Sequence, residues 1–498
     1  MNVANLLTEA AHERPEHPAF LFEGRAVTYQ ELERLTNQFA NFLGQRGVRQ
    51  SDVIAIFLES GPELIIAYVG ALKAGVVPNV VNASLKPEEV RLVVSDSRAL
   101  LLLTDPTRWQ SLEAVRDGMG TEHTLLTGDV AEDAELPTLD AALAEASSHF
   151  EALDLAPEAL ASLLYTSGTT GFAKGVMLSH RNIIDNAINF AQVHYTADDR
   201  LLIAAPLFHS WGLINGLLSS FVVRATAIVP RRYRTEPTLD LIEETRPTIM
   251  LGVPTMINYM SKSPSSSRRD LGSLRLILCA AAPMPLELIE SMKRLWNVGY
   301  AESYGLTETS PVITTTPHTE MRPGSCGRAM GDTVLKVVDA EGQPVPPGSV
   351  GELWARGTAI AAGYFGKPEI TAEVFTTDGW FKTGDIVKID EDGYVFIVDR
   401  VKDMINVGGE KVYPRDVEEV LHRHPAVADA VVVGVPDPNL GEVVKAYVAL
   451  KPDHTWTPEG VVDYLRPEVA SFKLPRSVEF VAEVPRSVSG KALRRLLR

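Results

Sequence analysis

Cysteine is scarce in this sequence: the 498 residues include two, Cys279 and Cys326. Two cysteines in a chain of this length cannot build a disulfide framework, so we expect a reducing compartment. The first residues lack the basic start and the long apolar segment of a secretory signal peptide. Long hydrophobic runs are also missing, since no stretch approaches the roughly 18 apolar residues of a membrane-spanning helix. These absences together predict a cytoplasmic protein with no integral membrane segment.

Positive charge is in deficit, with 47 lysines and arginines against 64 aspartates and glutamates and a formal net charge of −17. Binding of nucleic acid needs clustered cations that neutralise phosphates, so nucleic acid is excluded as the main partner. One basic cluster is present, at residues 491–498, and we expect it to form a solvated helix C-terminus, where cations suit the helix dipole. A homodimer is compatible with the sequence, but no residue pattern specifies one.

The patterning of apolar residues predicts an α/β fold with more than one domain, because a chain this long exceeds one ordinary core. Residues 28–47 place apolar side chains at helical spacing, with Thr28 and Glu31 as a capping box. Residues 52–60 are typical of a buried strand and residues 62–75 of the helix after it. This repetition resumes after residue 160 and predicts mostly parallel sheets covered by helices.

The pattern changes near residue 330. Over about 325–398, apolar and polar residues alternate between Gly/Pro turns and Asp392-Gly393 is a hairpin signal, so we expect a small antiparallel β unit. After residue 402, a helix, two strands and a second helix predict a compact α+β unit. We therefore predict a large N-terminal domain over residues 1–398, a boundary at 399–402 and a C-terminal domain over 403–498.

The stretch YTSGTTGFAKGV, residues 165–176, concentrates hydroxyl groups and glycine between two strand-like segments. Its backbone N–H groups, its hydroxyls and Lys174 could wrap an anion; a flexible turn is the alternative. The stretch departs from the common nucleotide-binding pattern G-x-x-x-x-G-K-[ST], because Gly175 follows Lys174 and no hydroxyl is present there to hold Mg²⁺. If this loop binds the phosphates of ATP, another part of the chain must supply the metal ligand.

Six further segments follow the loop, namely PLFHSWG at 206–212, AAAPMP at 280–285, SYGLTET at 303–309, FKTGDI at 381–386, DRVKDMINVGGEKVYP at 399–414 and PRSVSGKALRR at 485–495. Together they resemble the motifs of the adenylate-forming enzymes, which include acyl-CoA synthetases, luciferases and peptide-synthetase adenylation domains. The resemblance covers nearly the whole chain and is strongest to the fatty acyl-CoA synthetases. It implies a mobile C-terminal domain and two steps: a carboxylate attacks the α-phosphate of ATP to give an acyl-adenylate and pyrophosphate, and coenzyme A then displaces AMP.

The resemblance implies ATP-binding roles for residues of several motifs. Glu308 would hold Mg²⁺ and so provide the oxygen ligand that is missing beside Lys174; taken alone, it would be read as a surface acid. Thr307 would contact the α-phosphate. The β- and γ-phosphates would be bound by Thr166, Ser167, Gly168, Thr169, Thr170, Gly171 and Lys174, and the adenosine by Ala281, Ala282, Pro283, Tyr304, Asp385 and Arg400.

The C-terminal motifs imply the parts that move. Lys491 would reach across to bridge the substrate carboxylate and the α-phosphate, which a compact ammonium on a flexible stem can do; its alternative is the first charge of the basic tail. Lys402 lies at the family's hinge position. Rotation there would bring in Gly408 and Gly409, beside which the pantetheine arm of coenzyme A could pass.

Glycine at position 408 resembles the thioester-forming members, because luciferase-like members have a lysine there. Weaker candidates for binding the coenzyme A nucleotide lie in the segment SFKLPR. A basic pair at a helix end is the equal alternative for this segment. The candidates are Phe472, Lys473 and Arg476.

The acid would bind behind the segment PLFHSWG, where the family places the gate of the acyl pocket. His209 and Trp211 would form this gate. Small residues would leave room for an apolar chain or ring, namely Gly212, Gly216, Ala280 and Gly305. In peptide-synthetase domains an aspartate follows the phenylalanine, whereas here His209 follows Phe208. An α-amino acid would bring an unpaired cation into the pocket at high cost, so amino acids are disfavoured.

A medium- or long-chain fatty acid is therefore the first expectation for the substrate, and an aryl acid is the second. A small dicarboxylate is a third, with Arg231, Arg232 and Arg234 as counter-charges, although a solvated basic turn explains these three as well. Two other functions stay open. One is the loading of a carrier protein, for which no inserted segment is seen between Asp385 and Asp399. The other is a catalytically silent nucleotide-binding protein, which would be expected to lack Lys491 or Glu308.

Overall fold

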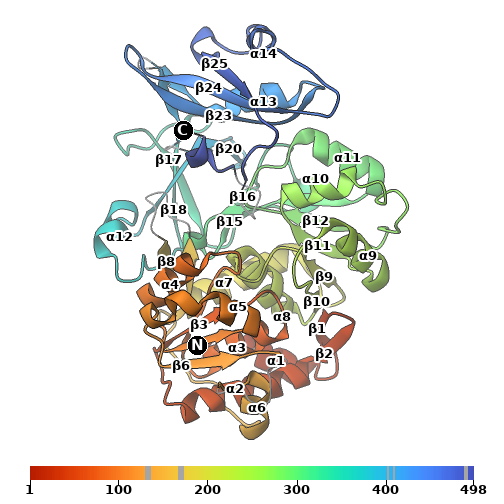
Figure 1. Cartoon of the computed structure of the whole chain (residues 1–498), viewed down its shortest axis with the longest axis vertical. Helices are drawn as coiled ribbons and strands as arrows, with labels where there is room; N and C mark the ends of the chain where they lie inside the picture. Colours follow the sequence, from red (N-terminus) through yellow and green to blue (C-terminus); the bar gives the residue numbers. More distant parts are fainter. Residues whose placement is uncertain (129–135, 167–172, 401–402, 408–409, 487–491, 498) are drawn as a thin grey trace.

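The computed structural model describes residues 1–128, 136–166, 173–400, 403–407, 410–486 and 492–497. Figure 1 shows an elongated molecule with the C-terminal elements stacked at one end, above the part built from the earlier residues. The order of sheets confirms the predicted α/β class, with mostly parallel sheets first and antiparallel sheets after them.

A six-stranded sheet comes first and has the order β6-β5-β3-β4-β7-β8. Its strands pair in parallel except for β7 and β8, which are antiparallel. The central strands are apolar and fully buried, as expected for strands that helices cover. The strands are β3 (Val53–Phe57), β4 (Val77–Val80), β5 (Leu101–Thr104), β6 (His123–Leu126), β7 (Leu160–Thr166) and β8 (Lys174–Ser179).

A seven-stranded sheet has the order β13-β12-β11-β9-β10-β1-β2 and is parallel apart from the hairpin of β1 and β2. Its strands are β1 (Pro18–Phe22), β2 (Arg25–Thr28), β9 (Arg200–Ile203), β10 (Thr226–Ile228), β11 (Ile249–Gly252), β12 (Leu276–Cys279) and β13 (Gly299–Glu302). Parallel strands end at the same edge of a sheet, so the residues after β12 and β13 lie side by side.

Helices cover these sheets, and their ends follow the sequence signals. The predicted capping position is confirmed, because Thr28 accepts a hydrogen bond from the Glu31 amide at the start of α2 (Tyr29–Gln45). The other helices of this part are α1 (Asn5–Glu13), α3 (Pro62–Lys73), α4 (Pro87–Asp96), α5 (Pro106–Ser111), α6 (Leu139–Glu145), α7 (His180–His194), α8 (Ser219–Val223), α9 (Thr235–Thr245), α10 (Pro254–Lys262), α11 (Leu286–Trp296) and α12 (Pro368–Val374).

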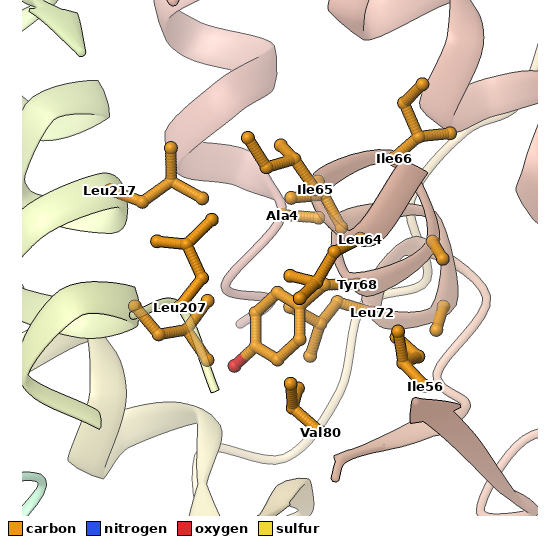
Figure 2. Packing of buried hydrophobic residues seen from close by; sticks show 14 of the residues in the cluster. Ala4, Ile56, Leu64, Ile65, Ile66, Tyr68, Leu72, Val80, Leu207 and Leu217 are labelled. Atoms are coloured by element: carbon orange, nitrogen blue, oxygen red, sulfur yellow. The ribbon is translucent and has the colours of Figure 1, made fainter. Parts of the chain in front are cut away.

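The largest hydrophobic cluster joins the two sheets. Figure 2 shows Leu64, Tyr68 and Leu72 of α3 packed near Leu207 and Leu217, which follow β9. All five side chains are fully buried. Burial of an aliphatic or aromatic side chain stabilises by roughly 1.5–3 kcal/mol, so this cluster fixes the segment PLFHSWG against the first sheet.

The expected antiparallel unit is present as a four-stranded sheet, β17 (Val334–Val338), β18 (Val350–Arg356), β19 (Phe381–Ile389) and β20 (Val395–Arg400). Gly393 has a φ of 84° in the β19–β20 turn, a left-handed conformation that favours glycine. A second antiparallel sheet, of β14 (Tyr304–Gly305), β15 (Val312–Thr315) and β16 (Arg328–Ala329), lies between this unit and the seven-stranded sheet in the chain order.

The C-terminal unit is a five-stranded sheet with helices α13 (Pro414–His422) and α14 (Pro458–Leu465). Its strands are β21 (Ile405–Val407), β22 (Glu410–Val412), β23 (Val427–Asp437), β24 (Gly441–Leu450) and β25 (Ser477–Phe480). β20 ends at Arg400 in one sheet and β21 begins at Ile405 in another. The hinge residue Lys402 lies outside the described residues, and the division into domains stays a prediction.

The interpretation of the basic tail as a solvated helix end does not hold at Arg494, the one charged residue of residues 491–498 whose side chain the structure describes. Residues Arg494–Leu496 form a single 3₁₀ turn, and the Arg494 side chain is 16% exposed. Its guanidinium bonds both oxygens of Glu418, at 2.7 and 2.8 Å. The charge of Arg494 is therefore balanced by Glu418 within the C-terminal unit. No helix within the described residues combines the length and the apolar character needed to cross a bilayer.

Candidate active site

The two ends of the predicted phosphate loop are held together by the sheet. β7 ends at Thr166 and β8 begins at Lys174, and these two residues face each other in the antiparallel register. A Cβ on Gly175 would lie 2.8 Å from the Tyr165 ring, so this position needs glycine. Ser167, Gly168, Thr169, Thr170 and Gly171 lie outside the described residues, so their phosphate-binding role stays a prediction.

Lys174 and Glu308 are brought together through a residue that the sequence reasoning missed. The Tyr364 hydroxyl donates to Glu308 Oε1 at 2.8 Å, and Lys174 Nζ lies 4.9 Å from the centroid of the Tyr364 ring. Glu308 is 8% exposed, and burial raises the pKa of Tyr364, which therefore stays a hydroxyl donor at neutral pH. The sequence offered no signal for Tyr364 beyond its place after Gly363.

The donor set around Glu308 suits a metal that arrives with a nucleotide. Within the described ranges no group of three His, Cys, Asp or Glu side chains is close enough to hold a metal ion. Mg²⁺ is commonly bound by one or two carboxylates together with substrate phosphates, so a single buried carboxylate beside the phosphate loop fits that mode.

A tight turn presents Glu308 and the adjacent Thr307. The 3₁₀ turn Thr307–Thr309 follows β14, and Ser310 closes it with a φ of 67°. A Cβ on Gly305 would lie 1.7 Å from the carbonyl oxygen of Pro311. The backbone of Pro311 therefore occupies the place of a side chain at residue 305, and the acyl-pocket role of Gly305 stays a prediction.

Tyr304 and Asp385, both predicted to bind adenosine, are in direct contact. The Tyr304 hydroxyl donates to Asp385 Oδ2 at 2.6 Å, and both residues are buried. Asp385 faces Arg400 across the β19–β20 ladder, which places the backbone of Arg400 beside it. Three predicted adenosine residues from separate motifs therefore meet at one place.

The predicted purine-binding segment Ala281–Pro283 lies at the carboxyl edge of the seven-stranded sheet, next to Tyr304. The amide of Ser303 donates to the Cys279 carbonyl at 2.9 Å, which joins the two loops. Ala281 has a φ of 72°, an uncommon left-handed conformation for a residue other than glycine. Ala281 and Pro283 are exposed, so both are available to a ligand.

Glu302, which the sequence reasoning also missed, holds this segment in place. Its Oε1 accepts a hydrogen bond from the Met284 amide at 2.6 Å, and the residue is 5% exposed. Burial raises the pKa of Glu302 to about 7, although the Met284 amide and the charge of Arg415 act in the opposite direction. A glutamate at the end of a strand gives no sequence signal of such burial.

The predicted gate residues differ in their surroundings. Trp211 is buried, its indole N–H donates to the Gly252 carbonyl at 3.2 Å, and it packs edge-on against Phe190. His209 Nε2 is buried and has no hydrogen-bond partner among the described residues. Burial lowers the pKa of His209 to about 4, so the imidazole is neutral at neutral pH.

The small residues near the gate are required by close packing within the protein. A Cβ on Gly212 would lie 2.5 Å from the Ala205 carbonyl oxygen, and one on Gly216 would lie 2.8 Å from Ile203. Ala280 is buried in the same hydrophobic cluster as Trp211. These contacts show that packing requires the two glycines, and the acyl-pocket role of Gly212, Gly216 and Ala280 stays a prediction.

Two of the predicted coenzyme A residues, Lys473 and Phe472, make contacts within the C-terminal unit. Lys473 Nζ bonds Asp416 Oδ2 at 2.5 Å, and Phe472 packs against the hydrophobic core of this unit. The side chain of Arg476 is exposed. Lys491, Lys402, Gly408 and Gly409 lie outside the described residues.

Comparison with known proteins places this geometry in a family. The family model "AMP-binding enzyme" matches residues 7–365, and the model "AMP-binding enzyme C-terminal domain" matches residues 416–491. A feruloyl-CoA synthase of Amycolatopsis sp. is 35% identical over 96% of this chain and 95% of its own length. A fatty acid–[acyl-carrier-protein] ligase, ScoC, of Streptomyces coeruleorubidus is 36% identical over 98% of this chain and 94% of its own.

Solved structures of acid–CoA ligases and related proteins superpose on the whole length of this chain. The anthranilate CoA ligase AuaEII, in complex with anthranoyl-AMP, superposes with a TM-score of 0.94 at 28% identity and covers 100% of this chain and 96% of its own. ATP-bound MatB from Rhodopseudomonas palustris has a TM-score of 0.92 at 31% identity and covers 100% and 98%. The chain therefore belongs to the AMP-binding enzyme family of adenylate-forming enzymes, among the acid–CoA ligases that use ATP, Mg²⁺ and coenzyme A.

Proposed function

We propose that this protein activates a medium- or long-chain fatty acid as an acyl-adenylate, with release of pyrophosphate, and transfers the acyl group to coenzyme A. The observation that carries the proposal is the contact of Lys174, Tyr364 and Glu308, which sets a cation and a carboxylate at the end of the phosphate loop. The polyphosphate of ATP needs positive charge along its length, and the carboxylate provides a ligand for Mg²⁺, which would add charge opposite the phosphate oxygens.

Activation is necessary because a carboxylate is a poor electrophile, whereas its mixed anhydride with AMP has a good leaving group. In the first step the acid attacks the α-phosphate beside Thr307, and Lys491 bridges the two anions from the C-terminal unit. Lys174 and the loop hydroxyls hold the departing pyrophosphate. The residues thus act mainly by positioning anions and stabilising their charge.

Adenosine is positioned by the contact of Tyr304 with Asp385. We propose that Asp385 accepts hydrogen bonds from the ribose hydroxyls, because a carboxylate has two acceptor oxygens and the Tyr304 hydroxyl orients the group through Oδ2. Ala281, Ala282 and Pro283 would line the purine. Glu302 would hold this segment in place, because its carboxylate accepts a hydrogen bond from the amide of the next residue, Met284.

Thioester formation would follow a rotation at Lys402, which withdraws Lys491 and brings Gly408 and Gly409 to the acyl-adenylate. Rotation of a small domain about a few residues is a recognised form of protein motion. Arg476 is exposed and is the better placed of the two basic candidates for the coenzyme A nucleotide, because Lys473 is already paired with Asp416.

The substrate is proposed from the surroundings of His209. A neutral imidazole supplies no counter-charge, so the pocket suits an acid with an uncharged tail. A dicarboxylate is less well supported, because Arg231 is bonded to Glu23 and Arg232 lies 4.0 Å from Glu59. A fatty acid as the substrate is supported by similarity to the fatty acid–[acyl-carrier-protein] ligase of Streptomyces coeruleorubidus. An aryl acid is the second candidate, favoured by the feruloyl-CoA synthase and the anthranilate CoA ligase.

Release of pyrophosphate from MgATP tests the proposal. The purified protein is incubated with fatty acids of increasing chain length, aryl acids and dicarboxylates, first with coenzyme A and then with a carrier protein. We expect release with fatty acids and thioester formation on coenzyme A. Preference for aryl acids would replace the first substrate class by the second, and thioester on the carrier protein alone would replace the acceptor. No release with any acid would refute the enzyme reading.

A further inference from the structure

We propose that Tyr364 is a positioning residue for the metal-bound nucleotide, which fixes Glu308 for Mg²⁺ and Lys174 for the phosphates at the same time. The proposal rests on the proposed role of Glu308 in the ATP-dependent reaction. It adds a residue that lies in none of the six motif segments and 56 positions after Glu308 in the chain.

The segment that carries Tyr364 is fixed to the phosphate-loop strand β8 by backbone hydrogen bonds. The Met177 amide donates to the Gly363 carbonyl at 2.9 Å, and the Phe365 amide donates to the Gly175 carbonyl at 2.8 Å. Gly363 has a φ of 131°, and a Cβ there would lie 2.4 Å from the Thr371 side chain. Tyr364 therefore sits on a rigid edge of the loop-bearing sheet.

The same segment holds Glu308 at two points. The Ala361 amide donates to the Glu308 carbonyl at 2.9 Å, and the Tyr364 hydroxyl donates to Oε1 at 2.8 Å. In the described part of the chain no hydrogen bond to Oε2 is found. One carboxylate oxygen is thus oriented by the protein, and the other remains for a cation. Metal-binding carboxylates are commonly held this way, and loss of the supporting group costs about 10- to 100-fold in metal affinity.

The face of the Tyr364 ring serves Lys174. Nζ lies 4.9 Å from the ring centroid, within the range of a cation–π contact. None of the ion pairs found among the described residues includes Lys174. The ring therefore steadies the ammonium without neutralising it, and the charge is retained for an anion. One side chain can thus set the spacing between the lysine and the carboxylate.

The test measures ATP binding by calorimetry in the absence of any acid, so that no turnover occurs. Each protein is titrated with ATP in Mg²⁺ and again in EDTA, and the ratio of the two dissociation constants reports how much the metal strengthens binding. We expect Tyr364→Phe to lower this ratio by about 10-fold or more while binding in EDTA stays unchanged. Glu308→Gln should bring this ratio, which we call the metal effect, close to one. Combining Tyr364→Phe with Glu308→Gln should lower the ratio no further.

The second arm of the test separates the ring from the hydroxyl. Tyr364→Leu removes both, and we expect it to weaken ATP binding in EDTA by a further factor of about 2 to 5 relative to Tyr364→Phe, the range of an exposed cation–π contact. Tyr394→Phe is the matched control, because it deletes a hydroxyl that bonds the Glu320 carbonyl at 2.8 Å. Its metal effect should equal that of the unmodified protein.

Because the readout is a ratio on one preparation, a fraction of unfolded protein cancels. Loss of the metal effect in Glu308→Gln together with a full effect in Tyr364→Phe would overturn the inference and leave the proposed function standing. A full metal effect in Glu308→Gln would overturn the role of Glu308 itself. Equal binding in EDTA by Tyr364→Leu and Tyr364→Phe would overturn the part that concerns Lys174.

Discussion

Acidic residues at the candidate active site and in the C-terminal unit have different partners. At the site, Glu302 accepts from a backbone amide and Glu308 from a tyrosine hydroxyl, both uncharged donors. In the C-terminal unit, acids bond cations. The pairs there are Asp416 with Lys473, Glu418 with Arg494, and Asp429 with Arg486.

This difference separates a binding surface from a self-contained unit. Glu308 is held through one oxygen by the Tyr364 hydroxyl, and Lys174, over the same ring, belongs to none of the ion pairs found among the described residues, so both can contact a ligand. An acid paired with arginine has its charge balanced inside the fold. The acids of the candidate site are thus held by uncharged groups, whereas most basic residues described in the C-terminal unit pair with acids of that unit.

The largest expected effect concerns Lys491, the basic residue of the C-terminal unit for which we propose a role in acyl-adenylate formation. Lys491→Ala should lower acyl-adenylate formation by about 10³-fold, since it removes a cation that acts on the developing charge. Thioester formation from supplied acyl-adenylate should be spared, because the lysine acts in the first step alone. Both half-reactions are followed separately, as pyrophosphate release and as thiol consumption. An equal loss in both would show that Lys491 has a structural role in the unit.

The second prediction concerns pH and the two kinds of acid. The folded pKa of Glu302, about 7, lies above its ordinary value of 4.5, so its stabilisation is full below about pH 4.5 and is lost as the pH rises to about 7. We expect the stability of the unmodified protein to fall by about 3 kcal/mol relative to Glu302→Gln across this range. Thermal unfolding at pH 5 and pH 8 measures it.

Asp429 supplies the control for this prediction. Burial raises its pKa, but the hydrogen bonds of His422 and Arg486 outweigh burial and lower the pKa to about 2. Its stabilisation is therefore present above its ordinary value of 3.8 and lost as the pH falls to about 2. The stability difference between the unmodified protein and Asp429→Asn should shrink as the pH falls from about 4 to about 2, the opposite direction to Glu302→Gln. A constant difference for Glu302→Gln from pH 5 to pH 8 would contradict the contrast between the two acids.

The third prediction compares the two lysines directly. Lys174→Met should weaken ATP binding by about 30-fold, because a charge-assisted contact to phosphate contributes roughly 2 kcal/mol. Lys473→Met should change the KM for coenzyme A by less than about 2-fold, because Lys473 is paired with Asp416 within its own unit. Loss of this partly exposed ion pair should disturb the unit little. Equilibrium binding of ATP and steady-state kinetics with coenzyme A give the two values. A large increase in KM for coenzyme A would place Lys473 in the nucleotide site.

The smallest expected effect lies at the adenosine site. Tyr304→Phe removes the hydroxyl that orients Asp385 and should raise the KM for ATP about 5-fold, the equivalent of one hydrogen bond. The preference for ATP over 2′-deoxy-ATP should fall as well, because Asp385 would no longer be held toward the ribose. The kcat should change little. An unchanged preference would separate Asp385 from ribose binding.

Much of the fold could be predicted because its signals are local. The alternation of strand and helix, the cap at Thr28 and the turn at Gly393 depend on residues close together in the chain. The predicted tail helix failed for the opposite reason. Arg494 is removed from solvent by Glu418, 76 positions earlier, and no pattern near residue 494 shows that partner.

By itself, the sequence determined the residue types and their order, and it predicted that a phosphate-binding loop here needs a metal ligand from elsewhere, because Gly175 follows Lys174. The tertiary structure alone decided what surrounds them. It placed Tyr364 between Lys174 and Glu308, raised the pKa of Glu302 by burial and left no room for a side chain at Gly305. Hydrogen bonding, burial and close packing depend on atoms that are near in space but distant in the chain, and local sequence patterns do not record those distances.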